Sequence, residues 1–111
     1  MSANDSVVIS GAGLWTPENV LTNTELVQVL NEYADKFNEE HASEIEAGTL
    51  EPVAKSDPDF ITKASGIRQR FVYVKDGIMD VDRMRPRITE RADDELSHQA
   101  EMAVAAAKKA L

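Results

Sequence analysis

The sequence predicts a single α/β domain, and three observations support this fold class. Residues 7–9 form a short run of Val and Ile with the length and composition of a buried strand. A second run rich in β-forming residues, 67–74, predicts another strand. Apolar residues recur with helical spacing over 26–37 and again over 96–111. Because strand and helix patterns alternate along a chain of 111 residues, we expect one core built from both.

Composition excludes several classes of protein. The chain has 42% hydrophobic and 29% charged residues, which is ordinary for a globular protein and argues against disorder. No apolar run approaches the roughly 20 residues of a membrane-spanning helix, and the first residues lack the features of a secretory signal. The absence of cysteine excludes disulfides, zinc ribbons and a thiol nucleophile in this chain. We therefore expect a cytoplasmic protein that does not associate with a membrane.

Charge is distributed unevenly about a net value of −8. Before Lys63, acidic residues outnumber basic ones by twelve to two, whereas from Lys63 onward basic residues outnumber acidic ones by ten to eight. The acidic part would repel nucleic acid, so no nucleic-acid partner is expected, and an anionic ligand is expected at or beyond Lys63. The acidity is equally explained by a solvated helix face.

The first predicted strand leads into a stretch of small residues, 10–13, which allows a tight turn or the close approach of another segment. Gly11 and Gly13 match the start of the dinucleotide-binding fingerprint. The third glycine of that fingerprint would fall at Thr16, and Pro17 stands where the phosphate-binding helix should already run. A Rossmann site is therefore not expected.

A long helix is expected to begin at Thr22, after an extended or turn segment at 14–21. The spacing of Thr22 and Glu25 predicts a capping box. The pattern continues weakly to Gly48, which suits the residue after a helix end. Four apolar residues at helical spacing are expected to form the buried face, Leu26, Leu30, Tyr33 and Phe37, and Val27 and Ala34 widen it.

A short helix is expected next, with Asp57 near its cap, Pro58 in its first turn and Gly66 at its end. The strand at 67–74 follows, and Asp76 with Gly77 predicts a turn.

Residues 78–91 are expected to form a surface loop that carries four arginines: Arg83, Arg85, Arg87 and Arg91. These guanidinium groups would suit phosphates or an acidic protein face. The alternative is that they are neutralised locally by neighbouring carboxylates.

The last predicted helix has acidic residues at 93–95 near its start and Lys108 and Lys109 near its end, as the helix dipole favours. Because the pattern runs to the last residue, we expect that more polypeptide follows. The expected buried stripe is rich in alanine and comprises Leu96, Ala100, Ala103, Val104, Ala107 and Leu111.

Few residues offer catalytic chemistry. His41 and His98 have no partner at a metal-ligand spacing, so no metal site is expected. The sequence contains no nucleophile elbow, His-Glu-x-x-His motif or Walker loop. The chain by itself is therefore not expected to be a complete enzyme.

Three blocks of sequence, taken in order, resemble a known family. The first comprises Val-Ile-Ser-Gly-Ala-Gly-Leu-Trp-Thr-Pro at 8–17 and Thr-Asn-Thr-Glu-Leu at 22–26. The second comprises Ser-Asp-Pro-Asp-Phe-Ile at 56–61 and Ser-Gly-Ile-Arg-Gln-Arg at 65–70, where the family usually has S-D-E-W-I and T-G-I-R-x-R. The third, 94–107, resembles the helix that follows. Together they resemble the β-ketoacyl-acyl-carrier-protein synthase III family.

The resemblance implies a thiolase-like αβαβα fold, generally homodimeric, in which residues 1–111 are the N-terminal portion of the first half. It implies a decarboxylating condensation of an acyl-CoA starter with malonyl-acyl-carrier protein, in fatty acid or secondary metabolism. Coenzyme A would be bound as a thioester substrate, with no cofactor. The family's nucleophilic cysteine and its assisting histidine and asparagine would lie beyond Leu111, so no catalytic residue is expected here. Expected partners are the remainder of the enzyme, acyl-carrier protein and acyl-CoA.

The resemblance also indicates two substrate-binding residues, Ser56 and Phe60. In the family, an aromatic residue (usually tryptophan) at the Phe60 position stacks on the adenine of coenzyme A, and a hydroxyl residue at the Ser56 position lies beside the same base. An arginine is normal at the Ala64 position, and the neighbouring Lys63 can replace part of its charge. The alternative is that Phe60 packs the short helix onto the core.

The stretch between residues 23 and 56 is longer than in compact members of the family, and a helical insertion is expected at about 38–55. An insertion near the substrate entrance would alter which acyl group is accepted.

An alternative function from another class is a small acidic α/β domain that binds a partner protein without catalysis. Such a domain would melt cooperatively as a monomer, whereas part of a larger enzyme would expose its alanine-rich helix stripe.

Overall fold

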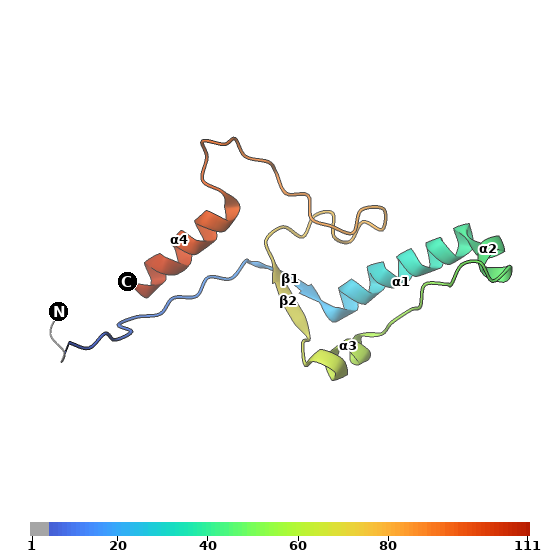
Figure 1. Ribbon diagram of the computed structural model, residues 1–111, viewed down its shortest axis with the longest axis horizontal. Helices are drawn as coiled ribbons and strands as arrows, with labels where there is room; N and C mark the ends of the chain where they lie inside the picture. Colours follow the sequence, from blue (N-terminus) through green and yellow to red (C-terminus); the bar gives the residue numbers. More distant parts are fainter. Residues whose placement is uncertain (1–4) are drawn as a thin grey trace. The chain divides into compact units, whose positions relative to one another are not determined.

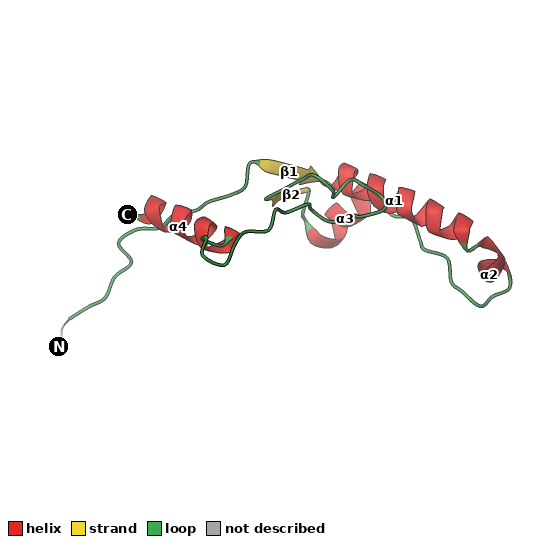
Figure 2. Ribbon diagram, turned by 90° about the horizontal axis from the view of Figure 1, so that it is seen from above, coloured by secondary structure: helices red, strands yellow, loops and turns green. Residues whose placement is uncertain are grey.

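The computed structural model describes residues 5–111, which contain helices and a small sheet. Figures 1 and 2 show these elements, which in chain order are β1 (Asn19–Thr22), α1 (Asn23–Glu40), α2 (Ala42–Glu46), α3 (Pro58–Ser65), β2 (Gln69–Val72) and α4 (His98–Ala110). The mixture of helix and strand agrees with the predicted α/β class. The chain divides into two compact units, and each is described separately: one is Pro17–Ile88, and the other combines residues 5–16 with Thr89–Leu111.

The sheet of the Pro17–Ile88 unit has two strands. β1 and β2 pair antiparallel, with Val20 opposite Phe71 and Leu21 opposite Arg70 (Figure 1). β2 lies inside the run 67–74, so that predicted strand is confirmed. β1 falls in a segment predicted only as extended or turn. The reason is that its four residues become a strand through pairing with β2, which lies about 50 positions further along the chain.

The first long helix begins where the sequence predicts. Thr22 is the N-cap of α1, and its side chain and that of Glu25 form the reciprocal bonds of a capping box. The helix ends at Glu40 and does not continue to Gly48, because the chain turns at His41 before the short α2. Gly48 has a φ of 78° and lies after α2.

The buried face of α1 differs from the predicted one. Tyr33, expected in the core, is 37% exposed, whereas Val29 is 1% exposed and Ala34 fully buried. Val27 and Asn23 are also buried on the helix, and Leu21 of β1 adds to this core. Burial of Val27 and Ala34 confirms part of the predicted face, whereas exposure of Tyr33 contradicts another part. The buried asparagine Asn23 was not predicted, because an amide interrupts the apolar pattern.

The short helix α3 is confirmed at both ends. The Asp57 carboxylate accepts a hydrogen bond from the Phe60 backbone N–H (2.8 Å), and Pro58 occupies the first turn. Gly66 has a φ of 74° and its N–H donates to the Thr62 carbonyl, which ends the helix. α3 packs against α1.

The strand expected at residues 7–9 is not present. Val7 and Ile9 are each 93% exposed, and within the described residues this run pairs with no other strand. A strand needs hydrogen-bonding neighbours, and the two-stranded sheet of the other unit does not include it.

The last helix begins later than predicted. Ser97 is the N-cap of α4 and accepts a hydrogen bond from the Ala100 N–H (3.2 Å), so the acidic residues 93–95 precede the helix. Lys108 and Lys109 lie in its last turn, as expected. Most of the predicted buried stripe is exposed, including Leu96 and Val104. The helix face turned toward residues 11–13 instead carries Ala106 and Ala110.

Gly11 and Gly13 lie against the backbone of α4. A Cβ atom on Gly11 would overlap the Ala110 carbonyl oxygen, and one on Gly13 would overlap the Ala106 carbonyl oxygen. The small residues therefore allow the close approach that the sequence indicated.

Replacing Gly13 with valine is expected to separate this segment from α4 and to lower the free energy of unfolding by about 2 kcal/mol. Urea denaturation of the 111-residue chain, with hydrogen exchange at the amides of α4, measures the effect. Ala12→Val is the matched control, because the side chain of Ala12 is exposed. Equal stability of the two variants would contradict the packing described above.

Candidate functional site

The two predicted substrate-binding residues lie at the start of α3. Ser56 is half-buried and stands just before the helix, and Phe60 lies in its first turn with 63% of its surface exposed. Phe60 is therefore not part of the core, which argues against the packing alternative. Lys63 is exposed and follows Phe60 by three positions, so the two side chains are neighbours on the helix surface. An exposed ring beside an ammonium group suits a flat, anionic ligand.

Ser56 is held by Asn31 of α1. The Ser56 N–H donates to Oδ1 of Asn31 (2.9 Å), and Nδ2 of Asn31 donates to the Ser56 carbonyl (3.0 Å). A second asparagine, Asn38, makes the same pair of bonds with Val53 at 2.8 and 3.0 Å. The backbone of the connection that leads into α3 is thus attached to α1 at two points, and the exposed ion pair of Lys55 with Asp35 adds a side-chain contact.

The far end of α3 is fixed by Asn23, which is 4% exposed. Its Nδ2 donates to Thr62 Oγ1 (3.1 Å) and to the Ile67 carbonyl (2.6 Å), and its backbone N–H donates to the Arg68 carbonyl (3.0 Å). Its Oδ1 accepts from Nη2 of Arg70 (2.9 Å). One buried side chain therefore joins α1, α3 and β2.

These asparagines were missed by sequence reasoning. Asn23, Asn31 and Asn38 lie on one face of α1 together with Val27 and Ala34, at helical spacing. A search for apolar periodicity assigns amides to the solvent side. The only available signal was the repetition of asparagine at that spacing.

Two of the four arginines in the group, Arg87 and Arg91, are neutralised by nearby carboxylates. Arg87 pairs with Asp80 (2.6 Å) and Asp76 (3.2 Å), and Arg91 pairs with Glu101 (2.8 Å). The guanidinium groups of Arg87 and Arg91 lower the pKa of Asp80 and Glu101, respectively, below their usual values. This supports the alternative of local charge balance for these two arginines.

An ion pair between Lys75 and Glu25 joins the loop after β2 to the first turn of α1. The Lys75 ammonium and the Thr22 N–H lower the pKa of the Glu25 carboxyl. Because the folded pKa lies below the unfolded one, the stability that this pair contributes is complete above the ordinary glutamate pKa of about 4.3 and is lost as pH falls below it.

We therefore expect Lys75→Met to reduce the loss of stability that acidification causes. Urea denaturation of the chain and the variant at neutral pH and near pH 3 measures the difference. Lys55→Met is the control, because it removes a lysine from a more exposed ion pair, that of Lys55 with Asp35. Parallel pH profiles for Lys75→Met and the unchanged chain would contradict the assignment.

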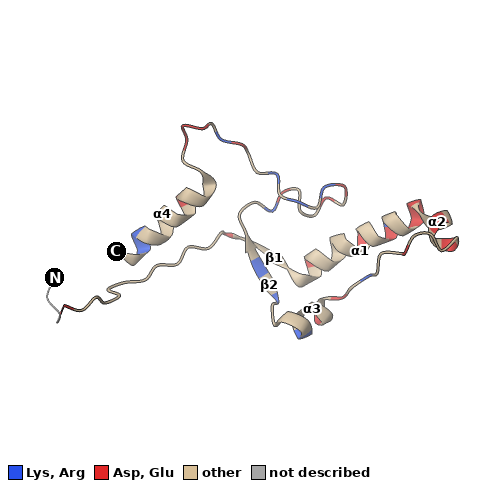
Figure 3. Ribbon diagram, viewed as in Figure 1, with Lys and Arg blue, Asp and Glu red and all other residues tan. Residues whose placement is uncertain are grey.

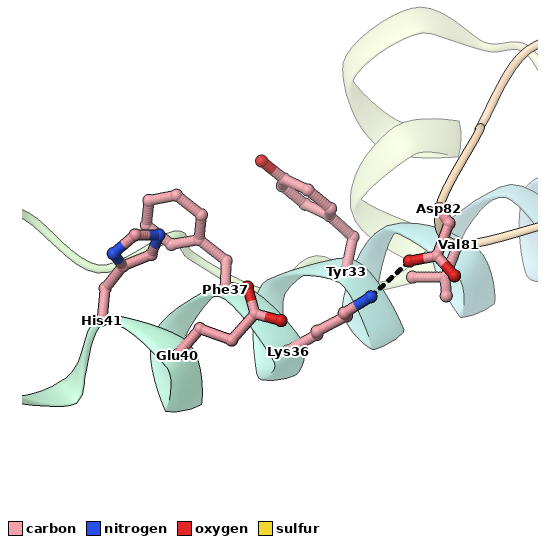
Figure 4. Close-up of a pocket in the computed structure, with 7 residues that line it drawn as sticks. All are labelled: Tyr33, Lys36, Phe37, Glu40, His41, Val81 and Asp82. Carbon is pink, nitrogen blue, oxygen red and sulfur yellow. Dashed lines mark hydrogen bonds and ion pairs between the residues drawn. The ribbon is translucent and has the colours of Figure 1, made fainter.

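A pocket of about 360 Å³ lies on the outer side of α1 (Figure 4). Rings follow one another along the helix: the centroids of Tyr33 and Phe37 are 6.0 Å apart, and those of Phe37 and His41 are 4.4 Å apart. Lys36 reaches Asp82 across the pocket, and this carboxylate raises the lysine pKa. The pocket is thus lined by three successive rings, those of Tyr33, Phe37 and His41, and by the ion pair of Lys36 with Asp82.

Apart from Glu25, the acidic residues of α1 and α2 are exposed, and Figure 3 shows acidic residues along the second half of α1 and on α2. This is the solvated acidic face that the sequence allowed. Within residues 5–111, no group of three or more acidic, histidine or cysteine side chains is arranged to hold a metal ion. No helix in the same range is both long and apolar enough to cross a membrane.

The motifs of the sequence resemble those of the β-ketoacyl-acyl-carrier-protein synthase III family, and a sequence comparison supports that resemblance. Over 85 residues the chain is 48% identical to the β-ketodecanoyl-acyl-carrier-protein synthase of Pseudomonas aeruginosa strain PAO1. The aligned stretch covers 77% of this chain and 24% of the relative, so the chain spans about a quarter of that protein's length. No family model matches the chain.

Proposed function

We propose that this chain forms part of a condensing enzyme that joins an acyl-CoA starter to malonyl-acyl-carrier protein. The observation that carries the proposal is the 48% identity to the Pseudomonas aeruginosa synthase. The same identity favours an enzyme over the alternative of a small interaction domain. The proposed whole protein has the thiolase-like αβαβα fold, acts as a homodimer in the cytoplasm and uses acyl-carrier protein as a partner.

The proposed reaction has two stages. A thiolate attacks the thioester carbonyl of acyl-CoA and releases coenzyme A, which leaves an acyl-enzyme. Malonyl-acyl-carrier protein then loses CO2, and the resulting carbanion attacks the acyl group to give 3-oxoacyl-acyl-carrier protein and restore the thiolate. This chain has no cysteine, so the nucleophile comes from the remaining polypeptide of the enzyme.

The part of the site that this chain contributes is the acyl-CoA entrance. Phe60 offers an exposed ring for the adenine, Lys63 a cation for the phosphates, and Ser56 a hydroxyl beside the base. The name of the relative denotes a ten-carbon β-ketoacyl product. Since the condensation adds two carbons, we propose a medium-chain starter. The helical insertion proposed at 38–55 contributes to this choice of acyl group.

A hybrid enzyme tests the proposal. The 111-residue chain replaces the corresponding region of the Pseudomonas aeruginosa synthase, and the purified hybrid is given octanoyl-CoA and malonyl-acyl-carrier protein. We expect release of coenzyme A and a 3-oxoacyl-acyl-carrier protein detected by mass spectrometry. The control is the same hybrid with its nucleophilic cysteine replaced by alanine. A hybrid that melts cooperatively but gives no product contradicts the proposed function.

A further inference from the structure

Two asparagines of α1 hold the connection between α2 and α3 by one and the same pattern of hydrogen bonds. Asn31 both accepts from and donates to the backbone of Ser56, and Asn38 does so with the backbone of Val53. Each side-chain amide thereby pairs with a backbone residue as one residue of an antiparallel strand pairs with another. We refer to these two pairings as the Asn31 clamp and the Asn38 clamp.

The spacing of the clamps fixes the path of the connection. Asn31 and Asn38 are about two helical turns apart on the same face of α1, with the buried Ala34 between them. Val53 must therefore lie beside Asn38 and Ser56 beside Asn31, which fixes the alignment of the connection along α1. The connection runs antiparallel to the helix, because Val53 meets the later asparagine and Ser56 the earlier one.

No other regular structure holds this segment. Residues 50–57 belong to no helix or strand, so the backbone N–H and C=O groups of Val53 and Ser56 depend on side chains or water. Both residues are half-buried, so their backbone is only partly open to water. The position of Ser56 is consequently set by α1 through the clamps.

The Asn38 clamp also closes residues 39–52 into a loop whose two ends meet. α2 and the left-handed Gly48 lie within that loop. The Asn31 clamp lies beyond the loop, on the side of α3. The loop is therefore attached to α1 at its base, through Val53, before the chain reaches Ser56.

We propose that Asn31 and Asn38 are positioning residues for the acyl-CoA entrance: they fix Ser56 and the start of α3 against α1 and so set the affinity for the coenzyme A thioester. The inference rests on the proposed function, because it takes Ser56 and Phe60 as the residues that meet the substrate. Neither asparagine touches the reacting atoms, so the effect falls on binding and not on the chemical step.

Asparagine-to-alanine substitutions in the hybrid synthase test the proposal. We expect Asn31→Ala to raise the KM for acyl-CoA about fivefold to tenfold and to leave kcat within about twofold. Asn38→Ala should have a smaller effect, since the Asn31 clamp still holds Ser56. The double variant should exceed the product of the two single effects, because the connection then loses its register. Gln28→Ala is the matched control and should leave KM unchanged, because within residues 5–111 that amide bonds only to Glu32 on the same helix.

Hydrogen exchange in the 111-residue chain separates this inference from the proposed function. Asn31→Ala should accelerate exchange at the Ser56 amide, and Asn38→Ala at the Val53 amide, whether or not the hybrid is active. Unaccelerated exchange would show that the clamps do not hold these amides and would overturn the proposal. Accelerated exchange with an unchanged KM, or a fall in kcat equal to the fall in kcat/KM, would overturn the positioning role. An inactive hybrid with accelerated exchange would instead reject the proposed function, and with it the proposed role at the substrate entrance.

Discussion

Replacing Phe60 with alanine raises the KM of the hybrid synthase for acyl-CoA about tenfold or more in our expectation, and changes kcat little. Stacking of a base on an aromatic side chain contributes about 1–3 kcal/mol, which corresponds to this range. The ring is available for stacking because 63% of Phe60 is exposed and α3 holds it by the Asp57 cap. Steady-state kinetics with varied acyl-CoA at saturating malonyl-acyl-carrier protein measures the effect.

Two further variants make this prediction specific. Phe60→Trp enlarges the stacking surface and should lower KM below that of the unchanged hybrid. Phe71→Ala removes a similarly exposed ring from β2 and should leave KM unchanged. If Phe60→Ala lowers the stability of the chain and leaves KM unaltered, the ring serves packing and the proposed entrance is wrong.

Features that depend on neighbouring residues were predictable from the sequence. The capping box of Thr22 and Glu25 and the Asp57 cap each involve side chains within three positions of the amides they bind. Gly66 ends α3 because the left-handed backbone conformation needed there has a low energetic cost for glycine. Local spacing contains the information for such contacts, so the ends of α3 and the start of α1 match the predictions.

Features that depend on distant residues were not predictable. β1 exists because Val20 meets Phe71 across the sheet, and nothing in the four residues of β1 demands a strand. Residues 7–9 show the converse, since a run with strong β preference stays unpaired without a neighbouring strand among residues 5–111. Propensity thus describes what a segment can form, whereas pairing decides what it does form.

The candidate site shows the same division. The family resemblance predicts Ser56 and Phe60 as substrate-binding residues, and both lie at the start of α3. Asn31 and Asn38 lie 25 and 15 positions, respectively, from their backbone partners, so no local sequence pattern predicts these contacts. Amide groups on the inner face of a helix also contradict the apolar pattern by which that face is usually found.

Asn23→Ala is expected to lower the free energy of unfolding of the Pro17–Ile88 unit by about 2–4 kcal/mol. The substitution removes both bonds of Nδ2 and leaves the Ile67 carbonyl without a side-chain donor. It also removes the acceptor of Arg70 Nη2, and Nη1 of the same guanidinium is already buried without an acceptor among the described residues. A half-buried guanidinium with neither Nη atom bonded is costly, so the loss of stability should exceed that of a single hydrogen bond. Urea denaturation followed by circular dichroism measures it, with Asn19→Ala, an exposed asparagine bonded to the Tyr73 carbonyl, as control.

A double-mutant cycle identifies the source of that loss. If the unpaired Arg70 guanidinium causes most of the stability loss in Asn23→Ala, removing that guanidinium should restore part of it. Arg70→Met should therefore lower the free energy of unfolding much less in the Asn23→Ala background than in the unchanged chain. The stability of Asn23→Asp should lie between that of the unchanged chain and that of Asn23→Ala. A carboxylate still accepts from Arg70 but has no donor for the Ile67 carbonyl. Additive effects of the Asn23 and Arg70 substitutions would contradict this network, because they would mean that the two side chains stabilise the unit independently.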